Sequence, residues 1–150
     1  MVKITHITEA SSSASHVYII EKNTVDIAGL DTSVVSAFLS SDKKFDYFKQ
    51  PEGFVFLVKA DQKTEEIRVL GNTIEGHISD AVESIQLHST NNEALYALTE
   101  GLLLSSYRFT KHFSKPKSYK LEEIYVDAHL TTEQIQELVS MAKSVFWTRD

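Results

Sequence analysis

The sequence predicts one α/β domain in which helices cover a mixed central β-sheet. The chain has 150 residues, a length that favours a single domain. Short runs rich in β-branched and aromatic residues alternate along the chain with segments whose apolar residues recur at helical spacing. Strands interleaved with helices in this way are typical of a layered α/β fold.

The first forty residues contain strand signals followed by one short helix. Val2–Thr8 alternates apolar and polar residues and is rich in Val, Ile and Thr, so we predict a strand there. His16–Glu21 predicts a second strand, and Thr24–Ala28 a third that would pair with it across a turn. Asp31 is a suitable N-cap for a helix over Thr32–Ser40.

The middle of the chain is expected to add further strands. Asp42–Gly53 is charged and aromatic and contains Pro51 and Gly53, so we interpret it as an irregular excursion. Phe54–Lys59 is a nearly continuous apolar run, which is typical of a strand covered on both faces. Glu66–Leu70 is expected to return as a strand that ends at Gly71-Asn72, and Ala81–Leu87 to form another. Thr73–Asp80 between them is ambiguous and receives no assignment.

A long helix is predicted over residues 93–114, capped by Asn91 or Asn92. Its apolar positions cover more than one narrow stripe, which indicates packing on two sides. Gly101 would cost such a helix roughly 1 kcal/mol relative to Ala. We therefore expect another backbone to approach the helix closely at Gly101. Pro116 lies in the segment Ser114–Lys120 that ends the helix.

The last thirty residues predict a strand and a second well-defined helix. Glu122–Ala128 has the composition of a strand. Thr131 and Gln134 form a capping-box pattern at the start of the final helix. The apolar residues that follow are spaced by three or four and define one face: Ile135, Leu138, Val139, Ala142 and Phe146.

Charge and composition exclude several classes of protein. With 15 basic and 21 acidic residues the net charge is −6, which disfavours binding to nucleic acid. The stretch from Arg108 to Lys120 is locally basic; we favour a solvated helix end over a weak anion or nucleic-acid patch. The chain has no Cys, which fits a cytoplasmic protein. No signal peptide is visible, and no apolar run approaches the roughly 18 residues of a membrane span.

No residue pattern predicts a catalytic, cofactor-binding or metal-binding site in this chain. None of the six His forms a helical zinc signature. Asp127 and His129 could present two ligands at the end of a strand, although a turn hydrogen bond is the favoured interpretation. No serine lies in a nucleophile elbow, and the five Gly are not clustered as in a phosphate cradle. Gly71 is the best single candidate for a ligand-facing loop, but an ordinary strand-to-turn glycine is favoured.

One stretch, EALYALTEGLLLSSYRFTKHFS at residues 93–114, resembles the long helix in the N-terminal domain of leucyl (cytosol) aminopeptidases. In that family the pattern runs close to A-E-G-A-L-L-G-S-Y-R-F. Thr99, Leu102 and Ser105 depart from it. A second likeness is Thr148-Arg149-Asp150, which resembles the junction where the family's catalytic domain begins. The matching helix residues are Glu100, Gly101, Leu103, Leu104, Ser106, Tyr107, Arg108 and Phe109.

The resemblance implies a macro-domain-like accessory domain, with a catalytic metallopeptidase domain following residue 150. That domain would bind two divalent ions, zinc or manganese, through Lys, Asp and Glu residues, including an Asn-Thr-Asp-Ala-Glu-Gly-Arg-Leu motif that does not occur here. Residues 1–150 would then support assembly of a hexamer and shape access to the active site, with structural or interface roles for Glu100, Gly101, Tyr107, Arg108, Phe109, Arg149 and Asp150.

Two other functions remain open at this point. One is a stand-alone macro-like module that binds a small ligand of the ADP-ribose type, although the scarcity of Gly argues against a diphosphate cradle. The other is a nucleic-acid contact through Lys111–Lys120.

Overall fold

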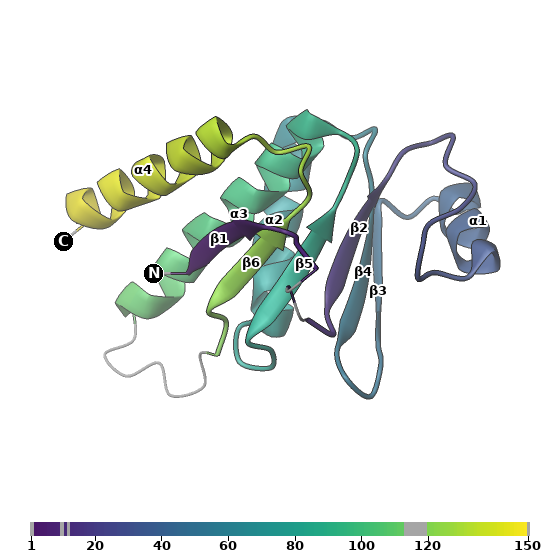
Figure 1. The fold of residues 1–150 in the computed structure, drawn as a ribbon, viewed down its shortest axis with the longest axis horizontal. Coiled ribbons are helices and arrows are strands. Elements are labelled where there is room, and N and C mark those ends of the chain that lie inside the picture. The colour runs from purple at the N-terminus through teal and green to yellow at the C-terminus, as the bar shows by residue number, and fades with distance from the viewer. Residues whose placement is uncertain (1, 10, 12, 113–119, 150) are drawn as a thin grey trace.

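The computed structural model describes residues 2–9, 11, 13–112 and 120–149, without the side chains of residues 107–112 and 146–149. These residues form six strands and four helices (Figure 1). In chain order they are β1 (Lys3–His6), β2 (His16–Ile20), α1 (Thr32–Ser40), β3 (Phe45–Lys49), β4 (Phe54–Lys59), α2 (Thr64–Ile78), β5 (Ser84–His88), α3 (Asn92–His112), β6 (Glu123–Val126) and α4 (Thr132–Arg149).

The strands form one mixed sheet in the order β1-β6-β5-β2-β4-β3. Every neighbouring pair is parallel except β3 and β4, which are antiparallel. The predicted fold class, a mixed sheet flanked by helices, is confirmed. Because β2, β5 and β6 are parallel neighbours, their carboxyl ends lie at the same edge of the sheet.

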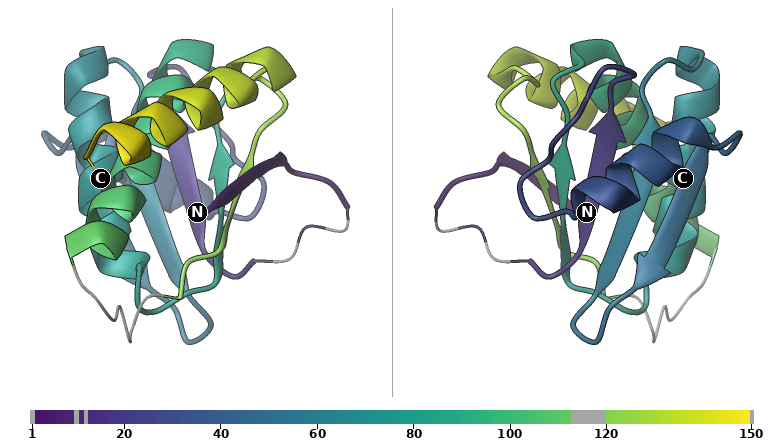
Figure 2. Two further views of the ribbon diagram at one scale, coloured as in Figure 1. Left: turned by 90° about the vertical axis from the view of Figure 1, so that its left-hand side faces the viewer. Right: turned by 90° about the vertical axis from the view of Figure 1, so that its right-hand side faces the viewer.

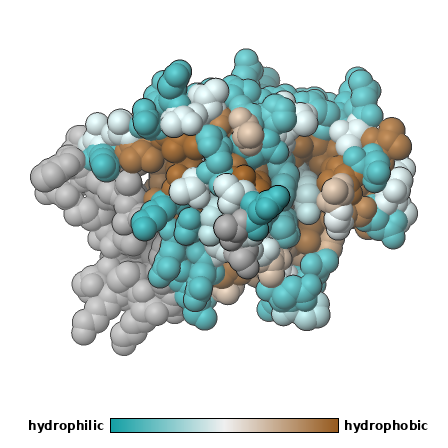
Figure 3. Space-filling view, viewed as in Figure 1, coloured by the Kyte–Doolittle hydropathy of each residue, from teal (hydrophilic) through white to brown (hydrophobic). Residues whose placement is uncertain are grey.

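Helices cover the two faces of the sheet unequally. The larger core joins one face of the sheet to α2, α3 and α4, and α2 and α3 pack against each other along much of their length. A smaller cluster joins the opposite face of β2, β3 and β4 to α1 (Figure 2). In the view of Figure 3, apolar side chains gather over α1 and along α4, and hydrophilic ones cover much of the surface between them.

Strand β4 shows the two-sided burial that its apolar run predicted. Phe56 and Val58 belong to the core with α2 and α3, whereas Val55 and Leu57 pack with α1. All four side chains are at most 3% exposed.

The expected strand at Thr24–Ala28 is wrong. This segment is a loop with two turns, in which the Thr24 amide donates to Glu21 and the Leu30 amide to Ile27. The physical reason lies in β2, whose two edges are already paired with β4 and β5, so a hairpin partner has no free edge to bind. Gly29 adopts a φ of 90° here, which favours glycine.

The expected excursion over Asp42–Gly53 is also wrong, because it contains β3. β3 and β4 form a hairpin, and Gln50 and Gly53 exchange two backbone hydrogen bonds across its turn, at 2.7 and 3.2 Å. Pro51 and Gly53 therefore mark a tight turn between two strands. As an edge strand, β3 tolerates the charged residues that suggested irregular structure.

The expected strand at Glu66–Leu70 is wrong as well, since these residues belong to α2. Ile67, Gly71, Ile74 and Ile78 are buried at spacings of four, three and four residues, which is a helical period. A window confined to Glu66–Leu70 is too short to separate this period from that of a strand. The unassigned segment Thr73–Asp80 is mostly the second half of the same helix.

The remaining predictions of elements are confirmed within one to three residues at each end where the structure describes them. Asp31 accepts a hydrogen bond from the Ser33 amide and caps α1. Asn91 caps α3, because its Oδ1 accepts from the Ala94 amide at 3.0 Å. The predicted end of the long helix falls on residues 113–119, outside the described part of the chain.

Candidate functional site

The residues that carry the family motif lie where α2 and α3 cross. A Cβ atom placed on Gly101 would be 2.0 Å from the carbonyl oxygen of Arg68 and 3.2 Å from the Cα of Gly71. A Cβ atom on Gly71 would be 2.4 Å from the carbonyl oxygen of Leu98. The expected close approach at Gly101 is confirmed. The two roles considered for Gly71, a ligand-facing loop and a strand-to-turn position, are wrong because it lies inside a helix.

The neighbouring motif residue, Glu100, links the same two helices. Its carboxylate accepts a hydrogen bond from Arg68 Nε at 2.5 Å, and its side chain is 17% exposed. Arg68 also pairs with Glu65, one turn earlier on α2. The Arg68–Glu100 pair holds α2 against α3, and the Arg68–Glu65 pair lies within α2. Both pairs fit a structural role for Glu100.

The other residues to which the resemblance assigned structural or interface roles have no described side chain. Tyr107, Arg108 and Phe109 continue the backbone of α3, and Arg149 is the last residue of α4, but these side chains lie outside the described atoms. Asp150 lies outside the described residues.

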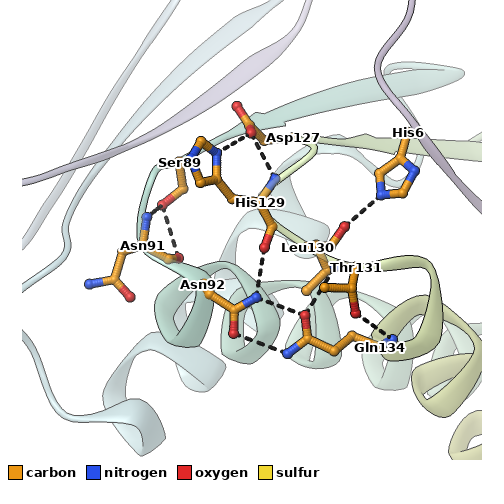
Figure 4. Close-up of polar contacts among 9 residues, drawn as sticks. All are labelled: His6, Ser89, Asn91, Asn92, Asp127, His129, Leu130, Thr131 and Gln134. Carbon is orange, nitrogen blue, oxygen red and sulfur yellow. Dashed lines mark hydrogen bonds and ion pairs between the residues drawn. The ribbon is translucent and has the colours of Figure 1, made fainter.

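A polar network joins the beginnings of α3 and α4 (Figure 4). The side-chain amide of Asn92 donates to the carbonyl oxygen of His129 and to Oε1 of Gln134, each at 2.7 Å. Gln134 donates in return to Asn92 Oδ1 at 3.0 Å. Gln134 and Thr131 also form the predicted capping box, with distances of 3.0 and 3.1 Å. Residues 42 positions apart in the sequence are thereby fixed to each other.

Asp127 and His129 form a turn at the carboxyl end of β6, as the favoured interpretation predicted. Asp127 Oδ1 accepts from the His129 amide at 3.0 Å and lies 2.6 Å from its Nδ1 (Figure 4). Among the residues that the structure describes, no group of three or more His, Cys, Asp or Glu side chains could hold a metal ion.

Three rings that the sequence did not single out stack on the α1 side of the sheet. Tyr18 and His88 are paired in register on β2 and β5, and their ring centroids are 4.8 Å apart with planes inclined by only 12°. His16 lies next to both, and its Nδ1 is 3.0 Å from Nε2 of His88. One of these nitrogens must carry the proton and the other accept it.

Burial keeps these two histidines neutral. Burial lowers the pKa of His16, and burial together with the nearby His16 lowers the pKa of His88 to about 4, although Asp127 opposes the change. Burial also raises the pKa of Tyr18, so its phenol stays protonated. At neutral pH this stack is therefore an uncharged aromatic surface.

The Tyr18–His88 stack forms one wall of a cavity of about 350 Å³ at the carboxyl ends of β2, β5 and β6. The loop after β2 supplies another wall, with Thr24, Asp26 and Ile27, and the β5–α3 loop supplies Ser89 and Thr90. A Cβ atom on Gly29 would be 3.3 Å from the Tyr18 hydroxyl, so the loop after β2 lies against the ring.

The cavity combines residues from separate segments, which is why single motifs did not reveal it. One signal was available: Ser89 and Thr90 follow a predicted strand and Asp127 lies near the end of another, and ligands of open α/β sheets bind outside the carboxyl ends of strands. Among the described residues, no helix has both the length and the apolar composition needed to span a bilayer.

No protein-family model matches the sequence, and no curated protein matches it either. Solved structures do match the fold. A mutant of tomato leucine aminopeptidase aligns with a TM-score of 0.62 and 16% identity, over 97% of this chain and 36% of that chain. The bottromycin maturation enzyme BotP aligns with a TM-score of 0.55 and 15% identity, over 88% of this chain and 31% of that chain.

The chain therefore spans about a third of the length of these two matching proteins. The resemblance predicted from the long helix is confirmed at the level of the fold: nearly the whole of this chain has the fold of one part of leucine aminopeptidase.

Proposed function

We propose that this chain is the non-catalytic N-terminal domain of a metal-dependent leucyl aminopeptidase. The observation that carries the proposal is the extent of the structural match, which includes 97% of this chain but only 36% of the tomato enzyme. The Glu100-Gly101 motif supports it independently, because both residues make the contacts that hold α2 against α3.

The proposed role is to support assembly of an oligomer, a hexamer by family resemblance, and to shape access to the active site. The partner is the catalytic domain of the same protein, in the cytoplasm, and that domain would hold the two divalent ions, zinc or manganese. The described residues of this chain do not offer a ligand set for these ions, so no chemical step is assigned to them.

The architecture fits a rigid accessory domain. α4 is joined to the start of α3 through Asn92 and Gln134 and packs on the core through Leu138 and Ala142. Arg149 ends this helix, and in this proposal the catalytic domain begins after it. A domain that is fixed at the beginning of its last helix can hold a following domain in a defined direction.

The first test is the natural reading frame beyond the codon for Asp150. A continuation that encodes the Lys, Asp and Glu metal cluster supports the proposal, and a stop codon overturns it. The second test compares residues 1–150 with the longer protein, by measuring hydrolysis of leucine amide with added zinc or manganese and the mass in solution. We expect activity and assembly only for the longer protein. Metal-dependent hydrolysis by residues 1–150 alone would contradict the proposal.

The cavity beside Tyr18 keeps one alternative open, a stand-alone macro-like module for a small ligand. Its described lining residues that carry a charge at neutral pH are all acidic, Glu21, Asp26 and Asp127, which disfavours a diphosphate such as ADP-ribose. Calorimetric titration with millimolar ADP-ribose is expected to give no binding heat. The nucleic-acid alternative rests on residues 111–120, and only Lys120 of these has a described side chain.

A further inference from the structure

We propose that the cavity between Tyr18, His88 and Asp127 binds a small organic cation, an ammonium or guanidinium group attached to a flat apolar body. This inference concerns a site within residues 1–150 and does not depend on the proposed role in an aminopeptidase.

The size and position of the cavity suit such a ligand. A volume of about 350 Å³ lies at the lower end of the range for small-molecule sites. The cavity lies at the carboxyl ends of three parallel strands, where open α/β sheets present their loops to ligands. Its loop wall is structured, because Thr24 and Leu30 each donate a backbone hydrogen bond that closes a turn.

The aromatic wall supplies the surface for the apolar body. Tyr18 is only 7% exposed, and its ring is stacked on His88 at 4.8 Å. Ile27 adds an apolar side chain from the loop. The apolar body of a ligand can therefore pack against the small exposed part of the ring stack and against Ile27, while its charged end reaches the carboxylates of the lining.

The charged side chains that line the cavity favour a positively charged ligand. The described lining residues include three carboxylates, those of Glu21, Asp26 and Asp127, and neither Lys nor Arg. His88 adds no positive charge at neutral pH, because burial and the adjacent His16 keep it unprotonated. An anionic ligand would be repelled by all three carboxylates, whereas a cation gains from each of them.

Three ligands that share one indole ring and differ in the charge of the side chain test the sign of the charge. We would titrate residues 1–150 with tryptamine, neutral N-acetyltryptamine and anionic indole-3-acetate at pH 7.5 and low salt, recording backbone amide shifts. We expect saturable shifts with tryptamine at Ser89, Thr90 and Asp127, and at least tenfold weaker binding of the other two. Equal binding of all three ligands, tighter binding of indole-3-acetate, or no binding of tryptamine would overturn the proposal.

Variants locate the site. Asp127→Asn keeps an oxygen that can accept from the His129 amide but removes the charge, and Tyr18→Leu removes the ring. We expect each to weaken tryptamine binding at least fivefold, whereas Asp46→Asn, on the distant edge strand β3, leaves it unchanged. If either variant fails to fold, Asp26→Asn on the exposed loop replaces it with the same expected direction. Unchanged binding in folded Asp127→Asn and Asp26→Asn would refute the assignment.

The pH dependence gives an independent readout. His88 becomes protonated as the pH is lowered toward 4. It adjoins His16 and the Tyr18 phenol, which stays uncharged, and it lines the cavity together with the carboxylates of Glu21, Asp26 and Asp127. The new positive charge opposes a cation, so the affinity for tryptamine should fall as the pH is lowered from 7.5 to 4, mostly below pH 5. An affinity that rises over this range would contradict the proposal.

Discussion

Gly71 and Gly101 face each other where α2 crosses α3, and neither position has room for a side chain. The added Cβ would approach backbone atoms in both cases, to 2.4 Å from Leu98 O for Gly71 and 2.0 Å from Arg68 O for Gly101. A flexible side chain could move away from such a contact, but the backbone of a packed helix cannot do so without separating the two helices. The pair therefore sets the distance between α2 and α3.

The first prediction is that Gly101→Ala destabilises the domain. Although alanine favours a helix more than glycine does, the methyl group would force α2 away from α3, and overpacking of this kind costs about 3 kcal/mol. Urea unfolding followed by circular dichroism measures the loss.

The matched control is Gly76→Ala on α2, where an added Cβ has no neighbour within 4 Å. This change should raise the free energy of unfolding by about 0.5 to 1 kcal/mol, through the helix propensity of alanine alone. If Gly101→Ala were as stable as Gly76→Ala, the close crossing of the two helices would be refuted.

The second prediction concerns the ion pair beside this crossing. Glu100→Gln should lower the free energy of unfolding by about 1 to 2 kcal/mol, because a half-buried, charge-assisted hydrogen bond from Arg68 is weakened. Arg68 keeps Glu65 as its second partner, which limits the loss. Chemical denaturation of both proteins provides the comparison.

Asp46→Asn serves as the control for Glu100→Gln. It breaks the exposed pair between Lys43 and Asp46, whose side chains are 64% and 44% exposed, and should cost less than about 0.5 kcal/mol. A loss for Asp46→Asn that equals the loss for Glu100→Gln would show that burial of the Arg68–Glu100 pair is unimportant.

The third prediction is that Asn92 and Gln134 are energetically coupled. Each side chain is both donor and acceptor to the other, so removing either one removes both hydrogen bonds between the beginnings of α3 and α4. Asn92 then keeps only the His129 carbonyl as partner, and Gln134 only its capping-box contacts with Thr131. A double-mutant cycle with Asn92→Ala and Gln134→Ala should give a coupling free energy of about 1 kcal/mol. Strictly additive losses would indicate that the two helices are not joined through this pair.

The fourth prediction is that acid destabilises the domain through His88. The pKa of folded His88 is about 4, below its ordinary value of 6.5. Between these pH values the unfolded chain binds a proton that the folded chain does not, so the free energy of unfolding falls as the pH decreases from 6.5 to 4. His16, whose pKa is lowered too, contributes in the same direction.

Urea titrations at pH 7.5, 6, 5 and 4 measure this dependence. In His88→Asn the loss of stability between pH 6.5 and 4 should be smaller than in the original protein, because one of the two groups no longer takes up a proton on unfolding. An identical loss in the two proteins would mean that His88 does not contribute to acid destabilisation.

Local signals in the sequence were sufficient for several elements. α1, the start of α3 and the start of α4 were predicted from caps at Asp31, at Asn91 or Asn92, and at the Thr131–Gln134 capping box, and the structure has Asn91 as the cap of α3. Each is a contact between residues at most three positions apart, so the neighbouring sequence contains all the necessary information. The apolar run of β4 was equally clear, since six residues of this composition, bounded by turn residues, are typical of a strand covered on both faces.

For the long helix, the sequence predicted a specific contact as well as the element itself. Gly101 in the middle of a strongly helical segment indicated a close contact before any partner was known, because glycine there would otherwise be a net cost. The sequence could not identify that partner. Residues 64–78, which provide it, were divided between an expected strand and a segment without assignment.

Whether a segment becomes a strand depends on the strand edges that are free to pair with it, and only the tertiary structure shows which edges are free. β3 is a strand because β4 offers it an edge, and Thr24–Ala28 is a loop because both edges of β2 are occupied. The cavity arises from the same cause. The parallel pairing of β2, β5 and β6 brings Tyr18, His88 and Asp127 together across more than a hundred residues of sequence. Helix caps and helical periods are local and can be read along the chain, whereas strand order and the site it creates depend on which segments compete for the same edge.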